Sequence, residues 1–335
     1  MKQFLALILL AALMLTGCGA PAAPAGTTAP ESSAASTAAS DPDTAVSAVP
    51  VLTFTDDLDR TVSLPAVPQR AACLLGSYAD VWTLAGGTCI AAPDDAWDDY
   101  HLELPDDAVN LGGTKHLSLE AILAAEPDFI IASSNSKSHL EWKDTLEASG
   151  IPVAYFKVTG FGDYLHMLRT LTDLTGNPAA FEACGTDVSA QIDAAIADSE
   201  ARLASAEPEK ILHMRMSASG LRVKNSKGNI LGEIAADLGC INIADSDDSL
   251  LENLSMEHIL LQDPDWILLV QQGDDVEGAQ AVLDRFIAEN PAWQELSAVK
   301  NDRVRILDKR LFSLKPNALW GQAYTELEQL LCEAE

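Results

Sequence analysis

The chain has 335 residues, enough for two domains of ordinary size, and its net charge is -29 at pH 7. A surface this acidic repels nucleic acid and anionic lipid, and neither is expected as a partner. The six cysteines include no CxxC pair, which argues against a structural zinc site or a dithiol redox motif.

Residues 1–18 predict an export signal. Lys2 supplies a positive start, residues 4–15 are apolar but too few to span a bilayer, and the run ends in Leu-Thr-Gly-Cys at Cys18. These four residues resemble the bacterial lipoprotein signal, in which the cysteine is diacylated and becomes the new N-terminus. The alternative is a plain secretory signal with a chance cysteine. Two acyl chains are enough to anchor a protein stably to the extracytoplasmic face of the cell membrane.

Residues 19–50 predict a disordered tether. Ala, Pro, Ser and Thr make up 25 of these 32 residues, and the stretch contains no Lys, Arg or aromatic residue. Such a composition cannot bury enough apolar surface to offset the entropy of ordering. As a random coil the tether would reach about 30 Å, which places the folded part just off a membrane surface.

Residues 51–159 predict an N-terminal α/β lobe. After an initial hairpin, strands alternate with helices, which indicates a mainly parallel sheet covered by helices on both faces. The acidic stretch 93–111 is expected to be a long loop, and a loop of this length inside a lobe is more often functional than not. The expected strands are 52–56 and 61–64 in the hairpin, then 70–75, 89–92, 129–131 and 152–156.

Residues 160–205 predict connecting helices, one over 160–176 and a second that Asn177-Pro178 restarts. Because a helix is a stiff linker, large hinge motion between the flanking lobes is not expected. Residues 206–335 predict a C-terminal α/β lobe that repeats the pattern of the first. Its expected strands include 210–216 and 304–307, and its expected loops are 217–229, 271–275 and 308–316.

Two stretches of the chain are nearly the same, and we call residues 117–131 and 254–268 the repeat units. Aligned without a gap, they match at eight of fifteen positions. In each, a serine caps a short helix, a glutamate (Glu120 or Glu257) follows in the first turn, and a Pro-Asp pair leads into an apolar strand. Units 137 residues apart favour two similar lobes over a solenoid. The predicted fold class is therefore α/β, with two mainly parallel-sheet lobes joined by a rigid helix.

Short motifs accompany the repeat units in a fixed order. They are TFTDD at 53–57 with RTV at 60–62, NPAW at 290–293 leading to VKNDRV at 299–304, and FSLKPNALWG at 312–321. From about residue 52 to the C-terminus, this order resembles the class III substrate-binding proteins of ABC importers, which bind iron-siderophores, haem or cobalamin. The resemblance implies two lobes with the ligand between them, no catalysis and no cofactor, and the permease and ATPase of an importer as partners.

The expected ligand site lies beyond the carboxyl ends of the parallel strands. Eleven of the 21 Lys and Arg residues fall within 210–227 and 300–315, which suggests an anionic ligand, although for any one of them a solvated surface position is an equal alternative. Aromatic side chains near the same loops could stack on a large planar ligand. The predicted ligand-binding residues are Ser77, Tyr78, Trp97, Tyr100, Asn135, Arg222, Lys224, Lys315 and Asn317.

Glu120 and Glu257 have two compatible interpretations. Each stabilises the start of its helix, which is worth about 0.3–1 kcal/mol. In the family that the chain resembles, glutamates at matching positions dock one lobe each onto cationic pockets of a two-fold permease. We favour the docking role for both.

A ferric siderophore is the ligand we expect, with haem or a corrinoid as the alternative in the same role. Haem needs an axial ligand, whereas no spacing of His, Asp or Glu predicts a directly bound metal ion. An anchored hydrolase or sensor domain is the alternative from another class, but neither a nucleophile elbow nor a Gly-rich phosphate loop occurs. A disulfide between Cys73 and Cys89 is left open. The nearest axial-ligand candidates are His101, His116, His213, Met214 and Met216.

Overall fold

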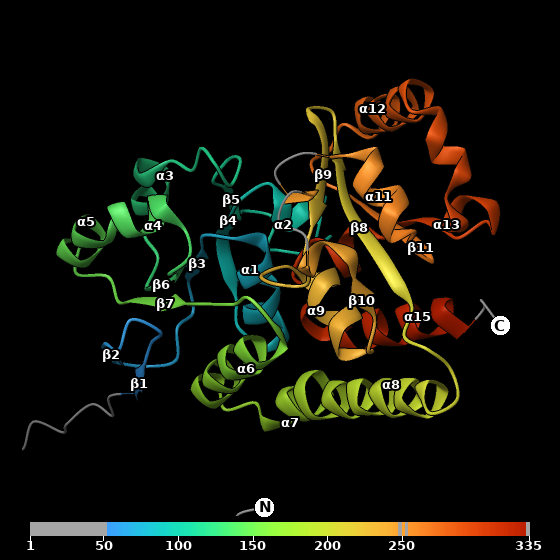
Figure 1. The fold of residues 1–335 in the computed structure, drawn as a ribbon. Coiled ribbons are helices and arrows are strands. Elements are labelled where there is room, and N and C mark those ends of the chain that lie inside the picture. The colour runs from blue at the N-terminus through green and yellow to red at the C-terminus, as the bar shows by residue number, and fades with distance from the viewer. Residues whose placement is uncertain (1–51, 247–249, 252–253, 333–335) are drawn as a thin grey trace, which may run out of the picture. The chain divides into compact units, whose positions relative to one another are not determined.

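The computed structural model describes residues 52–246, 250–251 and 254–332 (Figure 1). These residues belong to one structural unit, Val49–Glu335. The predicted export signal, Cys18 and the tether lie outside the described residues. Among the residues that are described, no helix is both long and apolar enough to cross a membrane.

The first lobe is built on a five-stranded sheet in which every pairing is parallel, with strand order β5-β4-β3-β6-β7. An antiparallel hairpin of β1 (Leu52–Thr55) and β2 (Thr61–Leu64) precedes it, as predicted. Asp56 fixes this hairpin to the sheet, because its carboxylate accepts a hydrogen bond from the backbone N–H of Tyr155 at 3.0 Å. The strands of the sheet are β3 (Ala71–Cys73), β4 (Cys89–Ala92), β5 (Val109–Asn110), β6 (Phe129–Ser133) and β7 (Val153–Phe156).

The second lobe is built on a sheet with strand order β10-β8-β11-β12, in which β9 pairs antiparallel to β8. The prediction of a loop over 217–229 is therefore wrong in part. Gly220, whose φ is +149°, allows a tight reversal, and Arg215 of β8 then pairs with Arg222 of β9. The strands are β8 (Lys210–Ser217), β9 (Gly220–Lys224), β10 (Ile241–Asn242), β11 (Trp266–Gln271) and β12 (Val304–Leu307).

Helices of the first lobe include one inside the stretch predicted as a loop over 93–111. This helix, α2, packs so closely on α1 that a Cβ at Gly76 would lie 2.6 Å from the backbone nitrogen of Ala96. Glycine is therefore required at this contact. The helices are α1 (Gly76–Leu84), α2 (Asp95–Asp98), α3 (Leu119–Ala124), α4 (Lys137–Glu141) and α5 (Lys143–Ala148).

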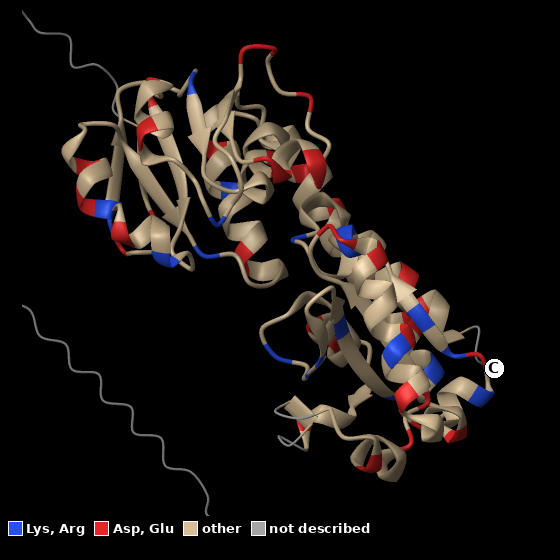
Figure 2. Ribbon diagram, turned by 90° about the horizontal axis from the view of Figure 1, so that it is seen from above, with Lys and Arg blue, Asp and Glu red and all other residues tan. Residues whose placement is uncertain are grey.

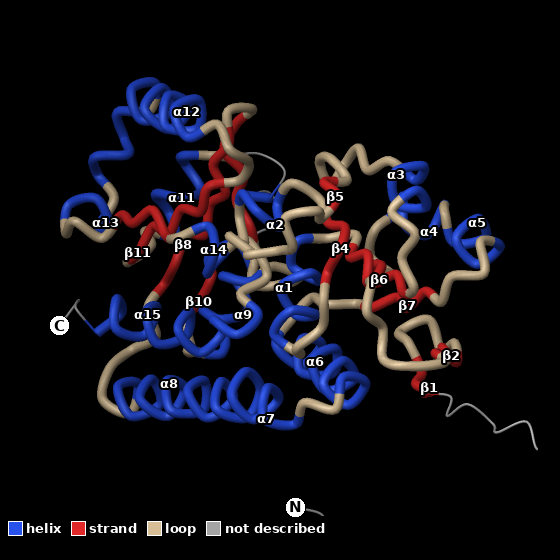
Figure 3. Tube along the Cα trace, turned by 180° about the vertical axis from the view of Figure 1, so that it is seen from behind, coloured by secondary structure: helices blue, strands red, loops and turns tan. Residues whose placement is uncertain are grey.

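The connection between the lobes is less regular than predicted. Helix α6 (Phe161–Thr175) ends at Gly176, whose φ of +69° suits a helix C-terminus. The second helix is not continuous, because α7 (Pro178–Phe181) passes into a π-helix, η1 (Glu182–Thr186), before α8 (Asp187–Leu203) begins. Helix α6 packs against α1 of the first lobe, and α8 packs along α15 of the second (Figure 3).

The remaining helices surround the second sheet. One of them, α14, lies within the stretch 308–316 that was predicted as a loop, because Asp308 caps it by accepting a hydrogen bond from the N–H of Arg310 at 2.7 Å. The α-helices are α9 (Ile230–Asp237), α11 (Met256–Gln262), α12 (Val276–Glu289), α13 (Ser297–Lys300), α14 (Lys309–Phe312) and α15 (Trp320–Cys332). Short 3-10 turns are η2 (Ile243–Asp245), η3 (Pro291–Glu295) and η4 (Asn317–Leu319).

The repeat units form equivalent helix–turn–strand units, α3–β6 and α11–β11. Ser118 and Ser255 cap the two helices by accepting hydrogen bonds from backbone N–H groups at 3.1 and 3.5 Å. Asp128 accepts a hydrogen bond from the backbone N–H of Arg70, just before β3, at 2.9 Å, and Asp265 accepts one from that of Lys210, the first residue of β8, at 2.8 Å. The predicted α/β class with two mainly parallel sheets is confirmed.

One apolar core is shared by both lobes. Its buried residues include Trp82 and Phe129 of the first lobe and Trp266 and Trp320 of the second. Smaller clusters fill the outer side of each sheet. The rings of Phe161 on α6 and Trp320 on α15 meet edge to face, with centroids 6.0 Å apart. Burial therefore joins the lobes at their base, where α6 and α8 run (Figure 1).

Cys73 and Cys89 are buried free thiols, so the disulfide that the sequence left open is not formed. Both side chains lie in the core shared by the lobes. Burial raises the pKa of Cys73 well above its usual value, which keeps this thiol protonated.

Candidate functional site

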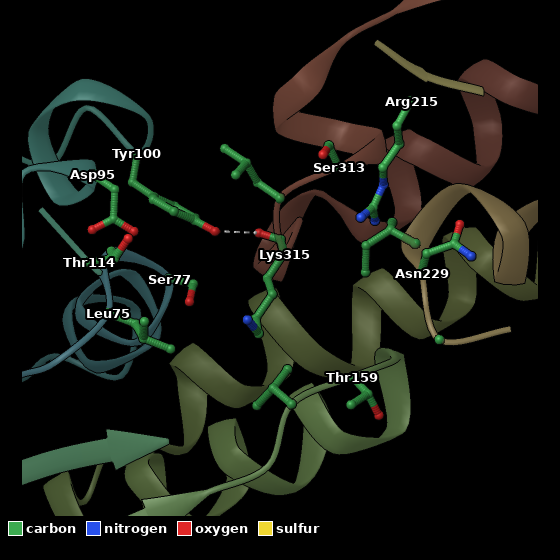
Figure 4. Close-up of a pocket in the computed structure, with 14 residues that line it drawn as sticks. Leu75, Ser77, Asp95, Tyr100, Thr114, Thr159, Arg215, Asn229, Ser313 and Lys315 are labelled. Atoms are coloured by element: carbon green, nitrogen blue, oxygen red, sulfur yellow. Dashed lines mark hydrogen bonds between the residues drawn. The ribbon is translucent and has the colours of Figure 1, made fainter. Parts of the chain in front are cut away.

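A cavity of about 330 Å³ lies between the two lobes (Figure 4), and we call it the interlobe cavity. Its volume is at the small end of the range typical of ligand sites. Leu75 follows β3 and Val158 follows β7, so part of the wall comes from the carboxyl ends of strands, as expected for parallel sheets. The first lobe contributes Leu75, Ser77, Asp95, Tyr100, Thr114, Val158 and Thr159. The second contributes Arg215, Gly228, Asn229, Ile230, Ser313, Leu314 and Lys315.

Two cations of the second lobe face this cavity. Arg215 on β8 is half-buried, and burial lowers its pKa. Its backbone is paired in the sheet, but its guanidinium makes no hydrogen bond or ion pair within the described residues. Burial also lowers the pKa of Lys315, whose ammonium lies 5.8 Å from the ring of Tyr78. Figure 4 shows both side chains extending into the space between the lobes. A partly desolvated cation without an anionic partner favours an anionic ligand.

One carboxylate, that of Asp95, faces the cavity from the first lobe. It accepts a hydrogen bond from the N–H of Gly76 at 3.0 Å, at the start of α1. Burial raises the pKa of Asp95 to about 6, with the charges of Asp99 and Asp94 adding to the increase and Gly76 and Lys315 opposing it. Among the described residues, the cavity wall therefore carries two positive charges and one carboxylate that is easily neutralised.

The start of α9 adds to this preference for anions. Asn229 caps α9 by accepting a hydrogen bond from the N–H of Gly232 at 2.9 Å, and Gly228, Asn229 and Ile230 all line the cavity. The positive end of the helix dipole thus lies at the wall beside Arg215. The chain as a whole is acidic, with 50 Asp and Glu against 21 Lys and Arg, and Figure 2 shows the acidic residues spread over both lobes.

Tyr100 closes one side of the cavity. Its hydroxyl donates a hydrogen bond to the backbone carbonyl of Lys315 at 3.2 Å, which links the lobes (Figure 4). The guanidinium of Arg310 lies over the Tyr100 ring, 4.3 Å from its centroid. Burial raises the pKa of Tyr100, so the phenol is neutral in the ligand-free protein and donates this hydrogen bond.

Three of the predicted ligand-binding residues, Ser77, Tyr100 and Lys315, line the interlobe cavity. Tyr78 and Asn317 instead lie behind its wall and hold the wall together. The hydroxyl of Tyr78 donates to the carbonyl of Phe156 at 2.8 Å, and the Asn317 amide donates to the carbonyl of Ser77 at 2.8 Å. Both side chains are buried, which leaves them no ligand-facing surface.

The other four predicted residues lie away from the cavity wall. Trp97 packs partly against the shared core, and Asn135 is exposed after β6. Arg222 is exposed and Lys224 half-buried on β9. The sequence pointed to the basic segment 210–227 but selected residues from an expected loop, and Arg215 was overlooked because it belongs to the strand. Asp95 was overlooked because nothing local in the sequence distinguishes it from the acidic residues around it.

The candidates for haem ligation do not reach the cavity. His213, Met214 and Met216 are buried in β8, whereas His101 and His116 are exposed. The wall contains no His, Met or Cys among its described residues. Within the same part of the chain, no three His, Cys, Asp or Glu side chains are placed to hold a metal ion.

Glu120 and Glu257 are both exposed in the first turns of their helices. In Figures 1 and 3 the helices that carry them, α3 and α11, lie on the side of the molecule away from α8. The two carboxylates thus occupy equivalent positions of the two repeat units, one in each lobe.

Comparison with known proteins places this architecture in a family. A family model described as "Periplasmic binding protein" matches residues 72–311. The chain is 27% identical over 223 residues to the vitamin B12-binding protein of Pectobacterium atrosepticum, covering 64% of this chain and 76% of that one. It is 23% identical over 239 residues to the iron-uptake system-binding protein of Bacillus subtilis, covering 71% of each.

A solved structure has the same fold, that of the periplasmic heme-binding protein RhuT from Roseiflexus sp. RS-1 in apo form. The TM-score is 0.64 at 22% identity, over 79% of this chain and 98% of that one. The family resemblance read from the sequence is confirmed. Because the family model spans more than half of its length, the chain belongs to the periplasmic binding protein family.

Proposed function

We propose that the chain is the substrate-binding component of an ABC importer and that its cargo is an anionic iron chelate of the ferric siderophore class. Membership of the periplasmic binding protein family supports the transport role. The observation that carries the choice of cargo is Arg215, a half-buried guanidinium without a partner in the described residues, at the wall of the interlobe cavity. A carboxylate of the chelate would supply its missing partner.

The charge of the cavity also supports this cargo. The chain as a whole carries a net charge of -29, yet the described residues of its cavity wall present Arg215, Lys315 and the start of α9 against a single carboxylate. A cation-rich wall on an acidic protein draws anions selectively into the cavity, because the rest of the surface repels them. Ser77 and Tyr100 would complete the contacts with polar groups of the ligand.

Haem or a corrinoid is the second candidate, since the relatives named above include a vitamin B12-binding and a heme-binding protein. The wall of the cavity favours a chelate over haem with a protein axial ligand, because its described residues include no His, Met or Cys and the hydroxyl of Tyr100 is bonded to the carbonyl of Lys315. A chelate whose own groups fill the coordination positions of the iron requires no protein ligand, and the protein then recognises only its charge and its shape. Binding is then reversible and involves no catalysis.

Delivery requires a membrane partner. We infer that Cys18 is lipidated and anchors the chain to the extracytoplasmic face of the membrane, and that Glu120 and Glu257 dock the two lobes on a permease. Docking both lobes favours a more open arrangement, which releases the ligand. The exposed, equivalent positions of the two glutamates support this role.

The test is an equilibrium titration of tryptophan fluorescence with ferric citrate, haemin and cyanocobalamin, each against the protein and two variants. Ferric citrate should bind tightest. Arg215→Gln should weaken it about 10- to 100-fold, because a hydrogen bond to a charged group is worth about 1.5–3 kcal/mol. The matched control is Arg222→Gln, directly opposite on β9 but exposed, which should weaken binding by less than about fivefold. No binding of any of the three ligands, or equal loss in both variants, would refute the proposal.

A further inference from the structure

Arg310 on α14 of the second lobe reaches across to the first lobe. Its Nη2 donates a hydrogen bond to the carboxylate of Asp80 on α1 at 3.1 Å. Its Nη1 donates to the backbone carbonyls of Lys315 at 2.8 Å and Pro316 at 3.0 Å. The same guanidinium lies 4.3 Å from the ring centroid of Tyr100. One side chain thus contacts both of the residues whose hydrogen bond closes the interlobe cavity.

The neighbours of Arg310 make parallel contacts. The buried amide of Asn317 donates to the carbonyl of Ser77 and to Asp80, both at 2.8 Å. Lys309 pairs with Asp99 of the first lobe and with Asp274 of the second, again at 2.8 Å. Residues 308–317, which we call the bridging segment, therefore bond to the first lobe through the side chains of Lys309, Arg310 and Asn317.

Asp80 makes this bridge sensitive to the loss of its partner. The carboxyl is largely buried, and burial raises its pKa, whereas the hydrogen bond from Asn317 and the charge of Arg310 lower it. Removing one partner of a buried charge leaves the other uncompensated, which is far more disruptive than losing a surface ion pair. Arg310 is thus held by its neighbours in one position.

We propose that Arg310 is the positioning residue of the interlobe cavity. Arg310 connects Asp80 and Tyr100 of the first lobe to the carbonyls of Lys315 and Pro316 in the second. These contacts hold the lobes at one separation before ligand arrives, and they orient Tyr100 and Lys315 at the cavity wall. The predicted effect on cargo release rests on the proposed function. The predicted effect on the separation of the lobes concerns the ligand-free protein, so it is independent of the proposed function.

Arginine suits this position and lysine does not. A planar guanidinium donates in several directions at once and stacks on an aromatic ring, whereas an ammonium is a compact point charge. Arg310→Lys keeps the charge beside Asp80 but cannot bond the two carbonyls and cover Tyr100 together. The variant therefore separates the geometric role of Arg310 from its charge.

The first arm of the test is hydrogen exchange of the ligand-free protein. The backbone amides of Trp97, Tyr100 and Leu102 donate hydrogen bonds within the first lobe. A change in their exchange after a substitution in the second lobe therefore shows that the two lobes are coupled. Arg310→Lys and Asp80→Asn should each speed exchange at residues 97–102 about tenfold, the loss expected for one hydrogen bond of average strength. Unchanged exchange there in both variants would overturn the proposal, because a purely local role disturbs only the bridging segment.

Arg305→Lys is the matched control. Arg305 lies in the same lobe, donates to the carbonyls of Asp302 and Val304, and lies over the ring of Trp266, yet none of these contacts reaches the first lobe. Its replacement should leave exchange at residues 97–102 unchanged. An equal effect of Arg305→Lys would show a general loss of stability and overturn the assignment of Arg310.

The second arm measures the release of ferric citrate by stopped flow. Arg310→Lys should speed release about tenfold with little change in the association rate, because the contacts that it loosens hold the cavity closed. Faster exchange without any binding of ferric citrate would count against the proposed cargo while upholding the bridge. A normal release rate together with faster exchange would refute the link between the bridge and the cavity.

Discussion

The protonation state of Asp95 determines the net charge of the interlobe cavity. Asp95 is the single carboxylate among the described residues of the wall, and burial raises its pKa to about 6. The carboxyl is largely ionised at pH 7 and largely protonated at pH 5. Protonation removes the negative charge that opposes Arg215 and Lys315, so the affinity for an anion depends on the state of this group.

We expect the affinity for ferric citrate to rise about fivefold from pH 7 to pH 5, corresponding to roughly 1 kcal/mol of relieved repulsion. At pH 7, Asp95→Asn should bind ferric citrate about fivefold more tightly than the native protein, and its affinity should lack the part of the pH dependence that Asp95 contributes. Because ferric citrate itself titrates, the measurement is the difference between the two pH profiles, obtained by fluorescence titration. Parallel profiles would contradict the role of Asp95.

The same group has a consequence for stability with a definite sign. Its folded pKa lies above the ordinary value of 3.8, so the folded state binds the proton more tightly than the unfolded state does. The contribution of Asp95 to stability is therefore greatest below pH 4 and is lost as the pH rises through about 6. Asp95→Asn should remove this part of the pH dependence in urea unfolding.

At the residue scale, the sequence predicted part of the site. Ser77, Tyr100 and Lys315 could be chosen because they follow strands or lie in an unusual acidic stretch. Arg215 could not be separated from Arg222, since the two lie opposite each other and only the exposure of β9 distinguishes them. Asn317 was chosen for a ligand, but its amide is used between the lobes.

Among the elements of the fold, strand β8 contains a buried histidine whose ring nitrogens have no hydrogen-bond partner within the described residues. This histidine, His213, is 1% exposed. Burial, with the charges of Arg215 and Lys224, lowers its pKa to about 3. The ring therefore stays neutral in the folded protein at any pH in the physiological range.

Replacing this side chain by a similar apolar one should stabilise the strand. We expect His213→Leu to raise the free energy of unfolding at pH 7 by about 1–3 kcal/mol, the usual cost of a buried polar group without a partner. Urea unfolding measures it, with His116→Leu, at an exposed position, as the control that should have little effect. A destabilised His213→Leu would mean that the ring nitrogens are satisfied in solution.

The pH dependence gives this prediction a second readout. Between pH 6.5 and about 3, the unfolded chain protonates His213 while the folded protein does not, so the stability from this group is lost as the pH falls. From pH 7 to pH 5 the loss is roughly 2 kcal/mol. His213→Leu should lose correspondingly less over that interval, and an unchanged slope would contradict the buried neutral state.

Elements with a strong local signal were predicted well, and those created by distant contacts were not. The hairpin β1–β2, helix α6 and strand β12 follow from alternation, amphipathic spacing and glycine at a helix end. Strand β9 depends on pairing with β8, and α2 depends on packing against Gly76, so neither could be read from its own residues. The π-helix η1 within the connection was not predicted, because its residues form no distinct motif.

At the scale of the whole molecule, Glu120 and Glu257 give the two lobes equivalent exposed carboxylates. Replacing both by lysine should abolish uptake of the cargo by cells while leaving its affinity unchanged, because like charges would then face the permease. Each single reversal should give an intermediate loss. Uptake of radiolabelled iron chelate, beside a binding titration of the purified variant, measures both quantities.

The control for docking changes the same charge elsewhere. Asp144→Lys with Glu289→Lys reverses one exposed carboxylate on each lobe outside the repeat units. Uptake should persist in this variant. If both double variants lose uptake equally, net charge rather than position is responsible, and the docking role fails.

The two-lobed architecture could be predicted, because each lobe contains one of the two similar repeat units. The separation of the lobes could not be predicted from the sequence. It depends on contacts such as Arg310 with Asp80, which are 230 residues apart, and a pairing at that distance leaves no periodicity or motif behind. The predicted domain bounds at residues 159 and 205 stay a prediction.

The most direct measurement is a crystal structure of the protein with ferric citrate bound. We expect the chelate to lie between the lobes, with a carboxylate on the guanidinium of Arg215, a second anionic group near Lys315, and the hydrogen bond of Tyr100 to the bridging segment intact. A chelate bound on another surface, or one inside the interlobe cavity without contact to Arg215, would contradict it.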